Sequence, residues 1–281
     1  SMMQRLEEKS DNAFPARAET AWKTYRETPS TPGISETWGA FFAAIQRANT
    51  VLNRVGQTAF TQAEQTANLK GFLEGQAYFL RALSYFYLVQ LYGDVPLYLD
   101  EIKDPSTAQQ PRAPAAEVYA QVKKDLDAAI PLLPLKSALT GSKNYEKSRP
   151  TKGAALALKA ELHLLLEEWQ AAADAAGQVI ASNQYSLHPT ADYVKNFQGR
   201  DENGRESVFE IQYTDNALAR GSILNTWYGL PGLVQGNGRY GSPTTDDTQT
   251  VKGRAGATGN GLVQAFEPTD IRKAVAISTY N

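Results

Sequence analysis

Residues 69–97 constrain the fold more than any other part of the chain, because they predict one long helix with a sharp end. Apolar side chains recur in this stretch at three- and four-residue spacings, which places them on one face of a helix. They are Leu69, Phe72, Leu73, Ala77, Leu80, Leu83, Leu88 and Leu91. Gly93 is expected to end the helix, and Pro96 prevents it from continuing. We therefore expect a single long, buried helix here.

Four other amphipathic segments predict further helices, so the fold class is expected to be mainly α. They span residues 35–55, 114–133, 152–167 and 170–181. The last two are rich in alanine, and small side chains allow two helices to approach closely, as in a tetratricopeptide-type helix hairpin. Helices in short-loop pairs favour a right-handed helical-repeat scaffold, with an ordinary helical bundle as the alternative.

The character of the sequence changes after Tyr185. Residues 207–213 alternate between apolar and polar side chains, which predicts a strand. Residues 221–261 hold about half of the chain's 21 glycines, so no long regular element fits there. We expect a single domain over residues 1–281. Its parts are an irregular N-terminal segment (1–34), a helical-repeat scaffold (35–185) and a loop-rich region (186–281) that is incomplete C-terminally.

Composition gives no support to several classes of function. The formal net charge is −2, without the basic stripe that nucleic-acid binding needs. The chain has no cysteine, so disulfides and cysteine-bound zinc are excluded. His163 and His188 form no His-Glu-x-x-His pattern, and His163 is expected to be a packed or half-exposed helix residue. We therefore expect neither a metal site nor a cofactor.

Motifs for catalysis or nucleotide binding are also weak. The glycine-rich run at residues 236–241 matches the dinucleotide fingerprint, but Ser-Pro follows it instead of a helix. No Gly-x-Ser-x-Gly occurs. A glycosidase needs two facing carboxylates, whereas the acidic pairs at 7–8 and 167–168 are sequential helix neighbours that do not converge. Asp246 and Asp247 lie in a loop, where convergence is possible, and keep a hydrolase open as an alternative.

Several separated blocks resemble, in the same order, the SusD/RagB family of surface nutrient-binding proteins. The most specific block runs from Gly75 to Leu97, and the others lie at residues 38–49, 112–134, 149–172, 206–213 and 262–272. The chain departs from the family at residues 270–272, where Asp-Ile-Arg stands in place of Asp-Pro-Arg. Family members are also generally longer, and they begin with a lipid-modified cysteine that this chain lacks.

The resemblance implies a SusD-like fold with a loop-rich ligand-binding portion. It implies a lipoprotein on the extracellular face of a Bacteroidetes outer membrane, held by a lipid anchor absent from this chain. Its function would be to capture glycans without catalysis and to deliver them to a SusC-like TonB-dependent transporter. The alternatives are capture of a peptide or another nutrient on the same scaffold, a helical-repeat module for protein interaction, and a glycosidase.

Candidate ligand-binding residues are aromatic side chains in the irregular segments. Sugar rings present apolar C–H faces, so a glycan site needs exposed aromatic rings with hydrogen-bonding groups nearby. The candidates are Trp22 and Tyr25 near the N-terminus, and Trp227, Tyr228 and Tyr240 with Asn237 and Arg239 in the glycine-rich region. No family motif supports these choices.

The residues of the matched blocks are expected to be structural. Trp38 and Trp169 lie on apolar helix faces and are predicted to be core residues. Arg81 lies among apolar neighbours, and a buried arginine must be paired. Glu74 lies two turns earlier on the same face and is its predicted partner. Asn49 is expected to bond to loop backbone.

Overall fold

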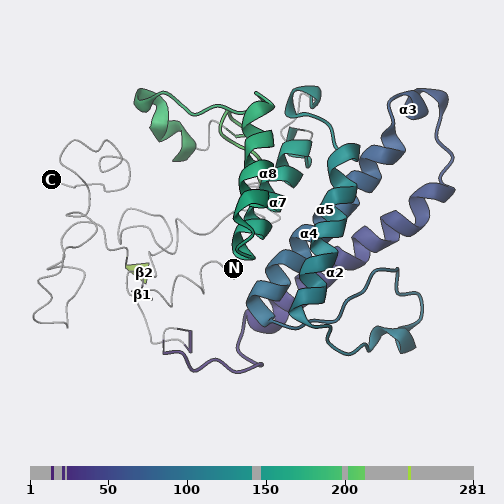
Figure 1. Ribbon diagram of the computed structural model, residues 1–281. Coiled ribbons are helices and arrows are strands. Elements are labelled where there is room, and N and C mark those ends of the chain that lie inside the picture. Colours follow the sequence, from purple (N-terminus) through teal and green to yellow (C-terminus); the bar gives the residue numbers. More distant parts are fainter. Residues whose placement is uncertain are drawn as a thin grey trace, which may run out of the picture. The chain divides into compact units, whose positions relative to one another are not determined.

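The computed structural model describes residues 14–15, 21–22, 24–140, 147–197, 202–212 and 240–241, which are mainly helical (Figure 1). The α-helices are α2 (Ile34–Arg54), α3 (Gln62–Thr66), α4 (Leu69–Tyr92), α5 (Ala115–Leu132), α7 (Lys152–Leu165) and α8 (Trp169–Ala181). The 3₁₀ turns are η1 (Val55–Gln57), η2 (Pro105–Ala108), η3 (Lys136–Ala138) and η4 (Thr190–Phe197). Strands β1 (Phe14–Pro15) and β2 (Tyr240–Gly241) pair antiparallel. The predicted mainly α fold is confirmed.

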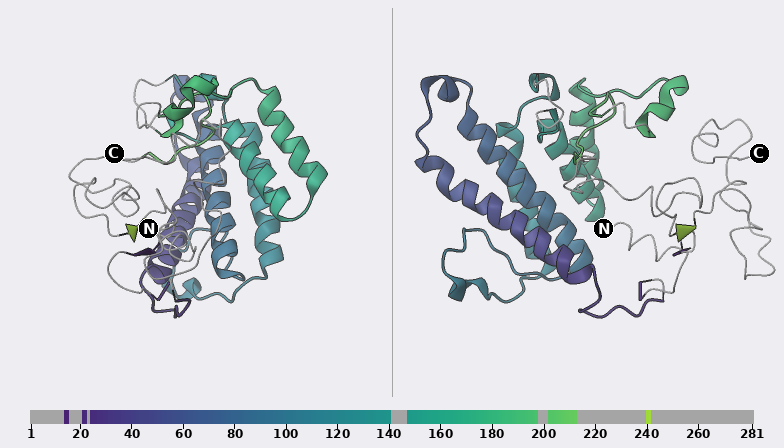
Figure 2. Two further views of the ribbon diagram at one scale, coloured as in Figure 1. Left: turned by 90° about the vertical axis from the view of Figure 1, so that its left-hand side faces the viewer. Right: turned by 180° about the vertical axis from the view of Figure 1, so that it is seen from behind.

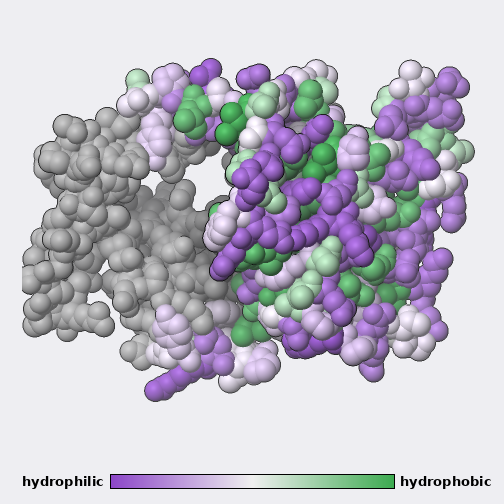
Figure 3. Space-filling view, in the orientation of Figure 1, coloured by the Kyte–Doolittle hydropathy of each residue, from purple (hydrophilic) through white to green (hydrophobic). Residues whose placement is uncertain are grey.

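The chain divides into two compact units. The first comprises residues 1–37, 189–194 and 213–281, and the second comprises residues 38–188 and 195–212. In the second unit α4, α5, α7 and α8 pack side by side in chain order, with α7 and α8 forming the predicted hairpin (Figures 1 and 2). On the face shown in Figure 3, hydrophobic residues reach the surface between hydrophilic ones.

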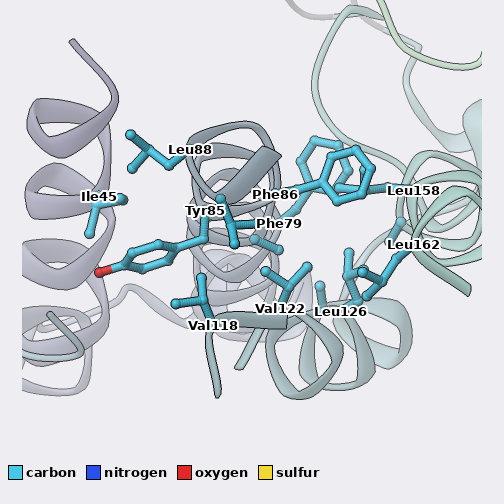
Figure 4. Close-up of a cluster of buried hydrophobic side chains, with 14 of the residues drawn as sticks. Ile45, Phe79, Tyr85, Phe86, Leu88, Val118, Val122, Leu126, Leu158 and Leu162 are labelled. Atoms are coloured by element: carbon cyan, nitrogen blue, oxygen red, sulfur yellow. The ribbon is translucent and has the colours of Figure 1, made fainter. Parts of the chain in front are cut away.

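Helix α4 is the centre of the hydrophobic core of the second unit. Its side chains Phe79, Tyr85 and Phe86 are at most 1% exposed. Figure 4 shows them between Ile45 of α2, the α5 residues Val118, Val122 and Leu126, and the α7 residues Leu158 and Leu162. Fully burying one such side chain contributes about 1.5–3 kcal/mol. The predicted long, buried helix is confirmed, but Leu80 from the predicted stripe is 41% exposed.

The ends of α4 follow from local backbone chemistry. Gly93 has φ +68°, which favours glycine, and its N–H donates to the carbonyl of Val89 at 2.9 Å. The predicted stop at Gly93 is therefore confirmed. At the other end Asn68 adopts φ 50° and separates α4 from the short α3, whereas the sequence pattern places the start of the long helix at about residue 66, without this break. Asparagine tolerates this left-handed conformation better than most residues.

A buried ion pair joins α4 to α5. The Arg81 guanidinium donates through Nε and Nη2 to the two carboxylate oxygens of Asp125, both at 2.7 Å. Its Nη1 donates to Asn49 Oδ1 at 2.8 Å and to the Leu99 carbonyl at 3.0 Å. The predicted pairing of Arg81 with Glu74 is wrong, because Glu74 faces Lys70 at 3.8 Å while Asp125 offers a bidentate partner across the helix interface.

Two further sequence predictions are wrong for physical reasons. Residues 207–212 form no strand: the ring of Phe209 packs edge-on against Phe79 at 5.1 Å, and Lys136 Nζ donates to the Ser207 carbonyl at 2.7 Å. Alternation alone cannot supply a partner strand for a ladder. Trp169 is 62% exposed instead of buried, since it begins α8 on a side that the described residues do not cover. Trp38, by contrast, packs against the core as predicted.

The turn between α7 and α8 is held by Glu168. Its carboxylate accepts from Lys123 Nζ of α5 at 2.5 and 2.7 Å and contacts Nδ1 of His163, which is 8% exposed. His163 lies in a helix as predicted, and of the two predicted environments, packed or half-exposed, the structure shows the packed one. The hydrogen bond from Lys123, followed by that from His163, lowers the pKa of Glu168 below its ordinary value of 4.5.

We predict that Asp125→Ala is far more destabilising than Asp127→Ala, two residues away on α5. The first leaves the Arg81 charge buried and unpaired, which costs about 3–5 kcal/mol. The second removes only an exposed partner of Lys159, which costs about 0–1 kcal/mol. Urea unfolding of both variants measures the difference. Equal losses would show that the buried pair does not hold α4 to α5.

We predict that Glu168→Gln lowers stability only where Glu168 is ionised. Because the folded-state pKa is lowered, the stabilisation is present above pH 4.5 and is lost as pH falls through the folded value. Melting temperatures of wild type and variant, recorded over about pH 3–7, should differ at the neutral end and converge at the acid end. Glu167→Gln is the matched control. A constant difference at every pH would contradict the assignment.

Candidate ligand-binding site

Tyr25 is an exposed aromatic side chain on a tight turn of the first unit. The turn is closed by the Arg26 N–H, which donates to the Ala21 carbonyl at 2.9 Å. Tyr25 has φ 54° and is 66% exposed. A bulky residue with positive φ is an outlier, and such strain concentrates at functional sites. Tyr25 therefore has the exposure that the sequence argument asks of a candidate residue.

Trp22 lies on the same turn but is buried. Its side chain is 5% exposed, and its indole Nε1 donates to the Pro32 carbonyl at 3.3 Å. It does not offer the exposed ring that the sequence argument expects at this position. Its geometry fits a residue that holds the turn carrying Tyr25.

Of the remaining predicted site residues, the structure describes only the backbone of Tyr240. Trp227, Tyr228, Asn237 and Arg239 lie outside the described residues. The backbone of Tyr240 belongs to β2 and pairs with Pro15 of β1. This pairing joins the N-terminal segment to the glycine-rich region. The proximity concerns the backbone of these two strands.

Sequence reasoning missed a cavity in the second unit. It has a volume of about 460 Å³ and lies between α2 and the segment that follows α4. Its lining residues are Trp38, Phe42, Ile45 and Gln46 of α2 with Pro96, Tyr98, Ile102 and Ala108. The aromatic pair at positions 38 and 42, one helix turn apart, was a signal for this cavity, but that spacing predicts core packing equally well.

The outer wall of this cavity is held in place by hydrogen bonds to its backbone. Asn49 Nδ2 donates to the carbonyls of Tyr98 and Asp100, both at 3.0 Å. The amide of Gln46 exchanges hydrogen bonds at 3.3 Å with the backbone N–H and carbonyl of Ile102. The two ends of the loop meet where the Ala113 N–H donates to the Val95 carbonyl at 2.9 Å. These hydrogen bonds hold the loop against α2.

Tyr85 adds a further support from inside the core. Its hydroxyl donates to the Tyr98 carbonyl at 3.1 Å and accepts from the Tyr98 N–H at 2.7 Å. Burial raises the pKa of Tyr85, so the phenol keeps the proton that it donates.

The described lining of the cavity is mainly aromatic and aliphatic. The Trp38 ring lies 4.8 Å from Phe42 and 5.1 Å from Tyr92, with the Arg112 guanidinium 5.3 Å from its centroid. No carboxylate, histidine or lysine is among the lining residues that the structure describes. Glu101 lies on the same loop and is ion-paired: a hydrogen bond from Arg54 lowers the pKa of its carboxyl group. Among the described lining residues Tyr98 carries a hydroxyl group, which donates to the Ala108 carbonyl at 2.6 Å.

Other chemical sites receive no support within the described part of the chain. Glu168 is engaged by Lys123 and His163, so it does not face a second acid. No group of three or more potential metal-ligating side chains occurs among the described residues. Asp246, Asp247 and the run at 236–241 lie outside them. None of the described helices is both long and apolar enough to span a bilayer.

Comparison with known proteins identifies the family. Residues 3–164 match a SusD-like family model described as "Starch-binding associating with outer membrane". A SusD-like protein of Formosa agariphila is 30% identical over 226 residues, which cover 74% of this chain and 42% of that protein. A second SusD-like protein of the same organism is 28% identical, over 88% of this chain and 45% of the relative.

Solved structures agree with this assignment. A SusD-like protein from Bacteroides fragilis superposes with a TM-score of 0.63 and 26% identity, over 77% of this chain and 42% of that one. A laminarin-binding SusD-like protein shares the fold with a TM-score of 0.64, 23% identity and coverage of 75% and 46%. The chain thus spans less than half of the length of the relatives named here. By the match over more than half of its residues, the chain belongs to the SusD-like family.

Proposed function

We propose that this protein captures glycans at the outer surface of a bacterial outer membrane without transforming them. The observation that carries the proposal is the family match over residues 3–164, whose description names starch binding and the outer membrane. Two solved neighbours are described as a carbohydrate-binding and a laminarin-binding SusD-like protein. Oligo- or polysaccharides are therefore the proposed ligand class.

The proposed role includes partners beyond the glycan. Capture at the cell surface is useful only when the glycan is passed on, and we propose a SusC-like TonB-dependent transporter as the recipient. A lipid anchor outside this chain would hold the protein at the membrane. Both proposals follow from the SusD/RagB resemblance, as does the extracellular location.

Tyr25 is the proposed contact that the geometry supports best. Its ring is exposed, and the turn beneath it is fixed by backbone hydrogen bonds and by the buried Trp22. Trp227, Tyr228 and Tyr240, with Asn237 and Arg239, are proposed to complete the site. An aromatic platform with amide and guanidinium groups nearby binds both the apolar face and the hydroxyls of a sugar.

We predict that Tyr25→Ala weakens glycan binding about three- to tenfold, because it removes one ring-stacking contact. The measurement is calorimetric titration of the full-length protein with a panel of soluble glycans that includes laminarin oligosaccharides, and with peptides. Tyr25→Phe keeps the ring and should bind like wild type. Trp22→Ala instead should destabilise the fold by about 3 kcal/mol. Binding unchanged in Tyr25→Ala would remove this residue from the site.

We also predict that a bound glycan is recovered intact. The same samples are assayed for new reducing ends during prolonged incubation. Release of reducing ends that is abolished by Asp246→Asn or Asp247→Asn would replace capture by hydrolysis. Binding of peptides alone, with no competition by sugars, would move the assignment to peptide capture.

A further inference from the structure

The cavity between α2 and the segment after α4 has the size of a small-molecule site. Its volume of about 460 Å³ falls in the range of roughly 300–1,000 Å³ that is typical of such sites. A dry apolar cavity of only about 150 Å³ already holds a benzene ring. Ala108 at its edge is exposed, so the cavity reaches the protein surface. None of its lining residues is among the proposed glycan contacts.

The lining favours an aromatic ligand over an aliphatic one. Trp38, Phe42 and Tyr98 all line the cavity and are half-buried, so solvent reaches part of each side chain. The Phe42 ring lies 4.8 Å from Trp38 and meets Tyr98 edge-on at 5.7 Å. Aromatic rings at such separations and tilts attract one another beyond the effect of buried area. A further ring in the cavity would extend this cluster.

The polar groups of the lining favour a neutral ligand with few hydroxyls. The Gln46 amide already uses its nitrogen and its oxygen on the backbone of Ile102, both at 3.3 Å. Among the described lining residues none carries a charge. A sugar would leave several hydroxyls without partners here, and a carboxylate or an ammonium group would lose its hydration without gaining a counter-ion.

The Tyr98 hydroxyl offers one polar contact. It donates to the Ala108 carbonyl at 2.6 Å, and its oxygen has lone pairs that accept a hydrogen bond. Because both residues line the cavity, this oxygen suits a ligand that carries one N–H or O–H donor. Phenol and indole are the simplest neutral aromatic molecules with such a donor.

We propose that this cavity binds a neutral aromatic molecule with one hydrogen-bond donor, of the size of phenol or indole. The ring lies against Trp38 and Phe42, and the donor bonds to the Tyr98 hydroxyl oxygen. The loop that carries Tyr98 is already held by Asn49, whose amide donates to the Tyr98 carbonyl, so ordering it costs little when the ligand enters. The site goes beyond glycan capture and does not depend on it.

The test is a titration of the full chain with phenol, followed by NMR of the tryptophan indole N–H groups. The chain has four tryptophans, and Trp38→Phe assigns the signal of Trp38. That signal should shift saturably, with a Kd of about 0.1–5 mM. Trp169 is 62% exposed and is the internal control, since its signal should not move. Benzoate and glucose should leave the Trp38 signal unchanged.

A pair of neighbouring variants locates the ligand. Ala108→Leu enlarges a lining side chain and should weaken phenol binding about tenfold, because it takes up space in the cavity. Gln109→Leu, the matched control, introduces the same side chain at an exposed position outside the lining. It should change the affinity by less than about twofold.

The variant Tyr98→Phe tests the hydrogen bond. It keeps the ring and removes the hydroxyl, so phenol should bind about three- to tenfold more weakly. Toluene lacks a donor and should bind the variant and the wild type alike. Its binding also shows that the cavity of the variant is intact.

Four results would overturn the proposal. One is an equal shift of the Trp38 and Trp169 signals, which would mark non-specific contact with tryptophan rings. Another is unchanged phenol affinity in Ala108→Leu. A third is tighter binding of benzoate or glucose than of phenol. The last is an equal loss of phenol and toluene in Tyr98→Phe, which would assign its hydroxyl to the loop and not to the ligand.

Discussion

The buried ion pair between Arg81 and Asp125 is the contact on which most of the second unit depends. The guanidinium, which α4 supplies, lies where α2, α5 and the segment after α4 meet, and it bonds to one residue from each of these three. Removing two charges from water is favourable only when nearly all of their hydrogen-bonding groups are satisfied. Here Asp125 also accepts from Gln121 Nε2 at 2.8 Å. All of these hydrogen bonds can form together in only a few relative placements of α4 and α5.

The same network shapes the cavity beside α2. Asn49 accepts from Arg81 and donates to the carbonyls of Tyr98 and Asp100. It therefore links the guanidinium to the loop backbone. A loop of this length is otherwise costly to order. Side chains from the helices satisfy several of its carbonyls: Asn49 bonds to those of Tyr98 and Asp100, and Arg81 bonds to that of Leu99.

The sequence predicts those structural features that depend on residues close to one another in the chain. Helix periodicity and the glycine at position 93 depend on near neighbours, and both predictions are confirmed. The partner of Arg81 lies 44 residues away and is set by how α4 meets α5, so Glu74 was the wrong choice. Residues 207–212 alternate like a strand, but a strand needs a partner that periodicity does not reveal. The exposed ring of Tyr25 was predictable from its irregular segment, whereas the burial of Trp22 on the same turn depends on packing around Pro32.

The buried core and the proposed ligand contact Tyr25 belong to different units of this chain. The buried contacts of the second unit hold regular helices together, while Tyr25 lies on a turn of the first unit. Loops on a rigid scaffold can change sequence without disturbing the core. If the proposed site is correct, a change of glycan preference requires substitutions near Tyr25 and in the glycine-rich region but none around Arg81. The positive φ of Tyr25 is then a cost that the hydrogen bonds of its own turn offset.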